Sequence, residues 1–321
     1  MTNLKSLTPV VAHSEPLAYL EYLGEDISDA NKPVVIESAW PLIVNGEPWL
    51  TILCTPIKLD YFVLGFLYNE GLITSPDDVL DLQIGQAPTN YPPRTHKAIE
   101  GNRVQGETLR RRDEAVIRVE LKNRNLRLPQ HRTLTSGCGG GITFVDLAAA
   151  REPVRSSLRV TPGQISDLMA RLMALVTDDY RRVGGFHTAG LGVPSLQESD
   201  VHQLLVAATD IGRHNTLDKV AGECLARDIS MREAILLTTG RVSVEMLGKA
   251  ARMQVPVVAT LNSPTHLAIE LAHEWRITLI GYARGTGMHI YAGWERICAA
   301  PPIGRPKHAR PASASPVLAH G

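Results

Sequence analysis

The sequence predicts an α/β protein in two parts, a smaller β-rich N-terminal subdomain and a layered α/β domain after it. From about residue 160 onward, short apolar runs alternate with segments of helical periodicity, which is typical of strands covered by helices on both faces. Before that point, apolar runs are separated by turn signals such as Asn45-Gly46, which favour antiparallel hairpins. The chain has 321 residues, 44% of them hydrophobic, enough to bury the core of one large or two modest domains.

The N-terminal subdomain is expected over residues 31–150, after a flexible tail over residues 1–30. Asp60 is expected to cap a helix over residues 61–70, and the stretch 86–112, with its prolines and glycines, to form an exposed insertion. Apolar runs with strand character predict the strands of this subdomain at residues 34–37, 42–44, 49–53 and 114–121.

The α/β domain is expected over residues 151–298, and the Pro-, Ala- and Ser-rich end over residues 299–321 is expected to be a disordered tail. Ser263 is expected to cap a helix that has Pro264 in its first position. The predicted strands of this domain are residues 203–208, 234–238, 255–260 and 277–282. The predicted helices are residues 164–176, 216–226, 243–253 and 264–275.

Composition narrows the classes of function. The 33 basic and 33 acidic residues cancel, so no global field draws the chain to nucleic acid or an anionic membrane, and any anion site must be local. Cys54, Cys138, Cys224 and Cys298 form no CxxC pair and no obvious disulfide framework, which indicates a reducing compartment. No apolar run has the length of a signal or a membrane span, so a cytoplasmic location is expected. Zinc-ligand spacings are also missing, so we expect no tightly bound metal.

One cysteine stands in a glycine-rich loop. Cys138 lies within Ser136-Gly137-Cys138-Gly139-Gly140-Gly141, where four glycines give the thiol a mobility that a structural cysteine does not need. Such a thiol can accept a group at one place and deliver it at another. By contrast, Cys224 falls on an apolar helical stripe and Cys54 ends an apolar strand, so both are expected in the core.

Three of the four strand-to-helix junctions of the α/β domain combine glycine with arginine. In open α/β sheets, ligands bind at the carboxyl ends of strands, where helix N-termini present N–H groups. At any single junction, turn-capping glycines and solvated arginines are the simpler interpretation, but repetition along one edge predicts a site for a bulky anion such as a nucleotide. Neither a P-loop nor a GxGxxG motif is present. The four junctions are residues 209–215, 239–243, 261–263 and 283–287.

Two histidines lie in segments of this kind. His187 is in the glycine-bearing segment 184–190, and an isolated histidine is more often a structural hydrogen-bonding residue than a ligand. His214 is the stronger candidate, because its junction also carries other groups able to bind a ligand. Asp218 and Lys219 follow one turn later, either as part of this site or as a surface ion-pair set.

Six segments together resemble the formate dehydrogenase accessory sulfurtransferase family, FdhD. They occur in the family's order over roughly residues 34–297. The stretches DIGRHN-x-LDK and GRVS-x-EM are long enough to be specific. The six segments are residues 64–71, 136–141, 184–189, 210–219, 239–246 and 284–285.

The resemblance implies a cytoplasmic sulfurtransferase that takes sulfur from a cysteine desulfurase and passes it to the molybdenum cofactor, bis-molybdopterin guanine dinucleotide, as required for formate dehydrogenase activity. It also implies a homodimer and a C-terminal fold similar to cytidine deaminases. Cys138 would carry the sulfur as a persulfide. The family pattern assigns contact with the cofactor to Tyr282, Ala283, Arg284, Gly285, Thr286 and Gly287. The guanine dinucleotide also suits the predicted anion-binding junctions, whose candidate residues are Arg213, His214, Asn215, Arg241, Asn262, Ser263 and His187.

The sequence departs from the family at one position in the loop. Gly141 stands where the family has a second cysteine, so mechanisms that use an internal disulfide are disfavoured, although one persulfide is chemically sufficient. This departure keeps open a different class of function, a non-catalytic chaperone that binds the molybdenum cofactor for formate dehydrogenase. A zinc-dependent nucleobase deaminase is a third alternative, and it rests on fold analogy alone.

Overall fold

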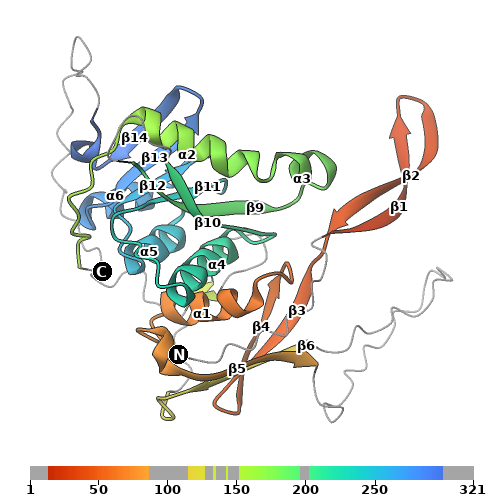
Figure 1. Cartoon of the computed structure of the whole chain (residues 1–321). Helices are drawn as coiled ribbons and strands as arrows, with labels where there is room; N and C mark the ends of the chain where they lie inside the picture. The colour runs from red at the N-terminus through yellow and green to blue at the C-terminus, as the bar shows by residue number, and fades with distance from the viewer. Residues whose placement is uncertain are drawn as a thin grey trace, which may run out of the picture.

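The C-terminal part of the molecule is built on a six-stranded sheet (Figure 1), in a computed structural model that describes residues 14–86, 115–126, 133–134, 142–143, 152–195 and 202–298. The strand order is β10-β9-β11-β12-β13-β14. Strands β11, β12 and β13 are mutually parallel, and β9 is antiparallel to both β10 and β11. Four strands, β10 to β13, therefore end at the same edge. The strands are β9 (His187–Val193), β10 (Gln203–Asp210), β11 (Ile235–Thr238), β12 (Val257–Thr260), β13 (Thr278–Arg284) and β14 (Gly287–Ala292).

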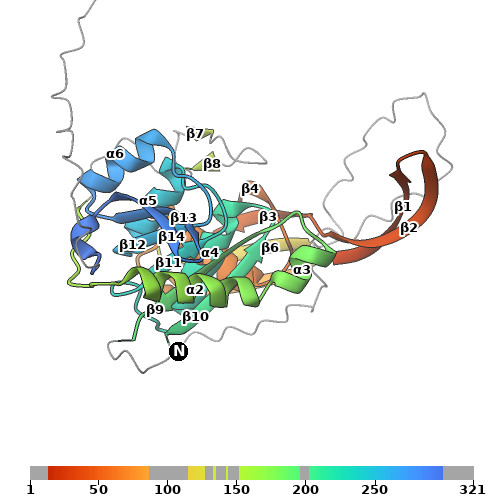
Figure 2. The ribbon, with the colours of Figure 1, turned by 90° about the horizontal axis from the view of Figure 1, so that it is seen from above.

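Helices cover both faces of this sheet, as Figure 2 shows. Residues of α4, α5 and α6 form one core with Leu236 and Leu279, while α2 forms a second core with Ile235 and Ile280 on the opposite face. Because adjacent strand residues point to opposite faces, both kinds of position must be apolar, and the predicted layered α/β fold is confirmed. The helices are α2 (Pro162–Ala174), α3 (Thr177–Arg182), α4 (Arg213–Ala226), α5 (Val244–Arg252) and α6 (His266–Glu274).

A four-stranded sheet and one helix make up the N-terminal part. The strand order is β4-β3-β6-β5, and β3 pairs antiparallel with β4 and parallel with β6. Asn45 and Gly46 join β3 to β4 with φ values of 51° and 82°, which confirms the predicted hairpin. The elements are β3 (Ser38–Val44), β4 (Glu47–Cys54), α1 (Leu59–Asn69), the 3₁₀ turn η1 (Pro76–Asp78), β5 (Val79–Gln86) and β6 (Ala115–Leu121).

The two parts meet where α1 crosses α4 (Figure 1). A Cβ atom on Gly65 of α1 would overlap the carbonyl oxygen of Asp218 in α4, and one on Gly222 would overlap the carbonyl oxygen of Tyr61. Only glycine permits backbones to approach this closely. The N-terminal helix therefore lies directly against the backbone of α4, whose first turn carries Arg213.

A two-stranded ribbon extends away from both sheets (Figures 1 and 2). It consists of β1 (Ser14–Leu23) and β2 (Asp26–Val35), paired antiparallel. The structure differs here from the tail expected over residues 1–30. Leu17 and Leu20 lie on opposite faces of the ribbon and are both exposed, at 59% and 69%. Since neither face is buried, the sequence lacks the alternation that marks a half-buried strand.

Two predicted helix caps are wrong. Helix α1 begins after Lys58, whose φ is 53°, and Asp60 lies in the first turn without capping it. The hydroxyl of Thr265, not that of Ser263, caps α6, because the preceding residues first bridge to Val242. Among the described helices, none combines the length and apolar character needed to cross a membrane.

Two short strands flank the cysteine loop. β7 (Thr133–Leu134) pairs antiparallel with β8 (Ile142–Thr143). Cys138 falls between them, outside the described residues, as do the 299–321 tail and most of the 86–112 insertion. The 3₁₀ turn η2 (Trp294–Arg296) ends the described chain. The domain limits at residues 30, 150 and 298 stay predictions.

Candidate functional site

The predicted junctions lie together at one edge of the six-stranded sheet. The segments after β10, β11 and β12 carry Arg213, Arg241 and Asn262, respectively. Strand β9 runs the opposite way, so its first residue, His187, stands at this same edge, opposite Asp210 in register. Because β9 lies between β10 and β11, His187 lies between the two arginine junctions. The geometry brings these candidate residues to one edge, and their contact with a ligand stays a prediction.

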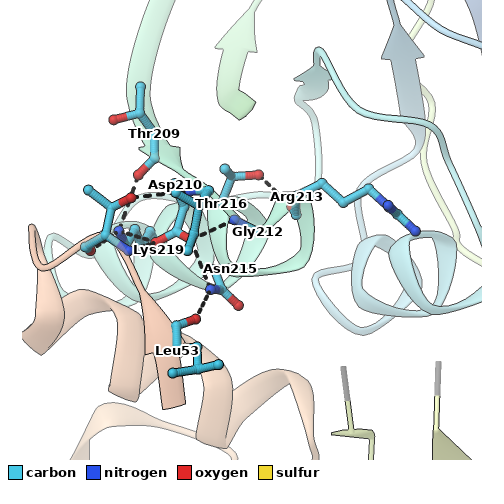
Figure 3. Close-up of polar contacts among 10 residues, drawn as sticks. Leu53, Thr209, Asp210, Gly212, Arg213, Asn215, Thr216 and Lys219 are labelled. Atoms are coloured by element: carbon cyan, nitrogen blue, oxygen red, sulfur yellow. Dashed lines mark hydrogen bonds and ion pairs between the residues drawn. The ribbon is translucent and has the colours of Figure 1, made fainter. Parts of the chain in front are cut away.

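Asp210 organises the junction between β10 and α4 (Figure 3). Its Oδ1 atom accepts hydrogen bonds from the N–H of Gly212 at 2.8 Å and from Nδ2 of Asn215 at 2.9 Å. Its Oδ2 atom accepts from Nζ of Lys219 at 2.6 Å and from the N–H of Thr55 at 3.1 Å. The carboxylate is fully buried, so these donors replace the water it loses. Asp210 therefore shapes the loop and is shielded from any ligand.

Two of these donors also connect the junction to the N-terminal part. Nδ2 of Asn215 donates to the carbonyl oxygen of Leu53 at 3.0 Å, in β4. Nζ of Lys219 donates to the carbonyl oxygen of Thr55 at 2.9 Å. The amide nitrogen of Asn215, a predicted cofactor contact, is thus engaged within the protein. The surface alternative for Lys219 is wrong, because its side chain is fully buried.

A second buried ion pair joins α5 to α4 and α1. Nζ of Lys249 lies 2.8 Å from both carboxylate oxygens of Asp218 and 3.4 Å from Oε1 of Glu70. Nδ2 of Asn69 donates to Oδ1 of Asp218 at 2.8 Å. Burial raises the pKa of Asp218 to about 6, while the charge of Lys249 opposes this rise. Asp218, like Lys219, is therefore an interior group and not part of a surface ion-pair set.

His214 is a buried, neutral imidazole. Its Nε2 atom lies 3.3 Å from Oε2 of Glu245 and 3.5 Å from Oγ of Ser243, both at the start of α5. Burial, together with the charges of Lys249 and Arg213, lowers the pKa of His214 to about 3. The neutral ring therefore forms no ion pair with Glu245, and its hydrogen bond to Oγ of Ser243 connects the first turn of α4 to the start of α5.

His187 is half-buried in cationic surroundings. Burial lowers its pKa, and the guanidinium groups of Arg213 and Arg241 lower it further, against the opposing charge of Asp210. Arg213 is itself buried, with its aliphatic carbons against Gly240, whereas Arg241 is exposed. The junctions on either side of His187 thus carry two arginines, one buried and one exposed.

Asn262 ties three strands together at this edge. Its Nδ2 atom donates to the carbonyl oxygen of Thr239 at 2.8 Å, and its N–H donates to Oγ1 of Thr260 at 3.0 Å. Its carbonyl oxygen accepts the N–H of Tyr282 at 3.1 Å, in β13. The carbonyl oxygen of Ser263 accepts from the N–H of Val242. Asn262 and Ser263 thus hold the strand ends together through backbone hydrogen bonds. Asn262 adds a hydrogen bond from its side-chain amide.

The predicted contact loop at the β13–β14 turn is divided between core and solvent. Tyr282 is 44% exposed, with a φ of 53°, and its ring lies 5.0 Å from the ring of His289. The side chain of Ala283 is buried in the core beneath α2, so only its backbone can meet a ligand. The residues that follow are exposed, and they are Arg284, Gly285, Thr286 and Gly287.

The described cysteines differ sharply in accessibility. Cys54 and Cys224 are fully buried, which confirms the predicted core positions, whereas Cys298 is exposed. Burial raises the pKa of Cys224 to about 12, and burial together with the charge of Asp210 raises that of Cys54. Neither buried thiol can form a reactive thiolate near neutral pH.

In the folded protein, iodoacetamide is expected to modify Cys298 and to spare Cys54 and Cys224, since alkylation needs an accessible thiolate. Peptide mass mapping before and after denaturation measures this. In denaturant, Cys54 and Cys224 should lose their protection and react with iodoacetamide as well. Modification of Cys54 or Cys224 at the Cys298 rate in the folded state would contradict the assignment.

Sequence reasoning missed Glu245, which lies beside His214, and Lys249, which pairs with Asp218. Both lie on α5, four residues apart, and are buried beside apolar neighbours. A charged pair on the otherwise apolar side of a helix is the signal that could have found them.

An open mixed sheet, covered by helices on both faces and bearing glycine–arginine junctions along one edge, places the molecule among layered α/β proteins. The family model described as the FdhD/NarQ family matches residues 35–298, and the chain belongs to this family. Proteins named sulfur carrier protein FdhD from Staphylococcus aureus strains MRSA252 and Newman are 34% and 33% identical to it, over 82% of this chain and 88% of theirs. A solved structure assigned as a formate dehydrogenase accessory protein from Desulfotalea psychrophila has the same fold, with a TM-score of 0.62 and 20% identity over 89% of this chain and 100% of that one.

Proposed function

We propose that this chain is a cytoplasmic sulfur carrier that serves formate dehydrogenase. It takes sulfur from a cysteine desulfurase as a Cys138 persulfide and transfers it to the molybdenum cofactor, bis-molybdopterin guanine dinucleotide. The names of its relatives support the sulfur-carrier role. The observation that carries the cargo assignment is the gathering of Arg213 and Arg241 on either side of His187 at one sheet edge.

The edge suits a cargo that bears a pyrophosphate. Guanidinium groups bind phosphate oxygens through paired N–H donors, and the first turns of α4 and α5 add backbone N–H groups and the positive ends of two helix dipoles. The buried pair of Asp210 and Lys219 holds the α4 junction in shape without placing a free carboxylate at the edge. The exposed Tyr282 and Arg284 extend this surface toward β14.

The sulfur chemistry needs one thiol. The thiolate of Cys138 attacks the outer sulfur of the desulfurase persulfide, a new sulfur–sulfur bond forms, and the desulfurase cysteine leaves as a thiolate. The sulfur–sulfur bond on Cys138 then breaks: the outer sulfur passes to the cofactor, which as acceptor supplies the two electrons that reduce it, and Cys138 leaves as a thiolate. Gly141 in place of a second cysteine removes the internal disulfide route but leaves this sequence of steps intact.

Intact-mass spectrometry after incubation with a cysteine desulfurase and cysteine tests the proposal. The wild type is expected to gain one sulfur, about 32 Da, which reducing agent removes. Cys138→Ala should gain nothing. Cys298→Ala is the matched control, because Cys298 is the exposed thiol among the described residues, and this variant should gain sulfur like the wild type.

No gain on the wild type, or an undiminished gain on Cys138→Ala, would refute the carrier mechanism. The first result, combined with retained cofactor binding, would favour the alternative of a non-catalytic cofactor chaperone. The lost second cysteine is the observation that favours that alternative.

A further inference from the structure

The position of His187 is fixed from both sides of β9. On one side it pairs in register with Asp210 of β10. On the other, the neighbouring Thr188 exchanges hydrogen bonds with Thr239, through Oγ1 at 3.0 Å and through the N–H of Thr239 at 2.9 Å. The backbone of His187 is therefore held between the junctions of Arg213 and Arg241.

The charged groups around His187 come from three elements. Arg213 and His214 belong to α4, Arg241 follows β11, and Asp210 ends β10. The one carboxylate in this set, Asp210, is already compensated by Lys219 at 2.6 Å. Since His214 is neutral, burial and the two guanidinium groups together outweigh Asp210, and the unliganded edge opposes protonation of His187.

We propose that His187 takes up one proton when an anionic ligand occupies the edge between Arg213 and Arg241, so that anion and proton bind together. The inference rests on the anion site of the proposed function. A dianion between the two guanidinium groups offsets their positive potential at the imidazole and favours its protonated form. The proton comes from solvent, the ring becomes an imidazolium, and both ring nitrogens can then donate hydrogen bonds.

His214 is distinguished from His187 by its contacts. Its Nε2 atom lies 3.5 Å from Oγ of Ser243 and 3.3 Å from Oε2 of Glu245, and the ring is buried within the first turn of α4. Lys249 adds a further positive charge beside it. The proton-accepting group of the edge is therefore His187, which is half-buried and already shifted to a lower pKa in the unliganded protein.

The sign of the effect follows from linkage. Binding raises the pKa of His187 from its lowered unliganded value, so anion affinity rises as pH falls from above the liganded pKa to the unliganded one. Within that window one proton gives a slope of at most about tenfold per pH unit. Below the unliganded pKa, the imidazole is protonated in both states and the affinity levels off.

The probe is methanedisulfonate, a dianion with pyrophosphate-like spacing that stays fully ionised in the range studied. Isothermal titration calorimetry from about pH 5 to about pH 8, in two buffers of different ionisation enthalpy, measures affinity and the protons taken up. The wild type should take up a fraction of a proton that approaches one within the window. Its His187 ring signals in NMR should titrate at a higher pH with the probe than without it.

His187→Gln should still bind the probe, without the pH dependence and without proton uptake. His273→Gln, at the far end of α6, should behave like the wild type. Binding by the wild type without proton uptake, or full uptake by His187→Gln, would overturn this inference and leave the proposed function standing. No binding of the probe at any pH would overturn both this inference and the proposed cargo site. Sulfur loading of Cys138 would still be tested separately by intact-mass spectrometry.

Discussion

Replacing Lys219 by methionine is expected to lower the free energy of unfolding by about 3–5 kcal/mol, the usual cost of breaking a buried ion pair from one side. Lys219 is fully buried, and its Nζ atom donates to Asp210 at 2.6 Å and to the carbonyl oxygen of Thr55 at 2.9 Å. Methionine has a similar volume but no donor. It leaves the charge of Asp210 and the carbonyl oxygen of Thr55 without their strongest partner. Urea unfolding followed by circular dichroism measures the change.

A surface pair provides the matched control for Lys219. Arg171 and Asp167 pair at 2.7 Å on α2, with both side chains about two-fifths exposed. Arg171→Met should therefore cost no more than about 0.5 kcal/mol. The double variant Asp210→Asn with Lys219→Met should recover part of the loss, because it removes the uncompensated charge. A loss for Lys219→Met no larger than that for Arg171→Met would contradict the buried-pair assignment.

Gly222→Ala is expected to destabilise the protein by roughly 3 kcal/mol or more, at the upper end of overpacking effects. The added Cβ atom would overlap the carbonyl oxygen of Tyr61, which is backbone and cannot rotate away. Helices α1 and α4 would have to separate, and water would reach the hydrogen bond between Asn69 of α1 and Asp218 of α4. Thermal and urea unfolding measure the loss.

A helical glycine without such contacts is the control for this substitution. A Cβ atom on Gly163, in the first turn of α2, would meet only Oγ1 of Thr161, at 3.8 Å. Gly163→Ala should leave stability unchanged or raise it by up to about 1 kcal/mol, because alanine loses less backbone freedom on folding. Equal effects of Gly222→Ala and Gly163→Ala would show that the helix contact is looser than described.

The strands and helices of the C-terminal part could be predicted because the number of buried faces of each element sets its pattern of apolar residues. A strand buried on both faces needs apolar residues throughout, and a helix that packs on a sheet needs one apolar stripe. Strand β9 escaped prediction because Gly190 and Gly192 interrupt it. These glycines make room for Leu172 and Leu168 of α2, contacts that only the tertiary structure discloses.

The sequence predicts which residues gather at the candidate site, but it does not predict how they are arranged there. Gly–Arg junctions at strand ends predicted that these residues share one edge, since parallel strands end together. That the edge binds an anion stays a prediction. Sequence order could not show that β9 is inserted antiparallel between β10 and β11, which places His187 at that edge. Nor could it show that Asp218 and Lys219 turn inward, because their partners Lys249 and Thr55 lie far away in the chain.

The crossing of α1 and α4 also sets the mechanical character of the molecule. Helices that touch backbone to backbone have no intervening layer of side chains whose rotamers could change to let them slide. The N-terminal strands and the cationic sheet edge therefore share one rigid frame. A displacement of the N-terminal sheet would therefore move the first turn of α4, and Arg213 with it, as a single body.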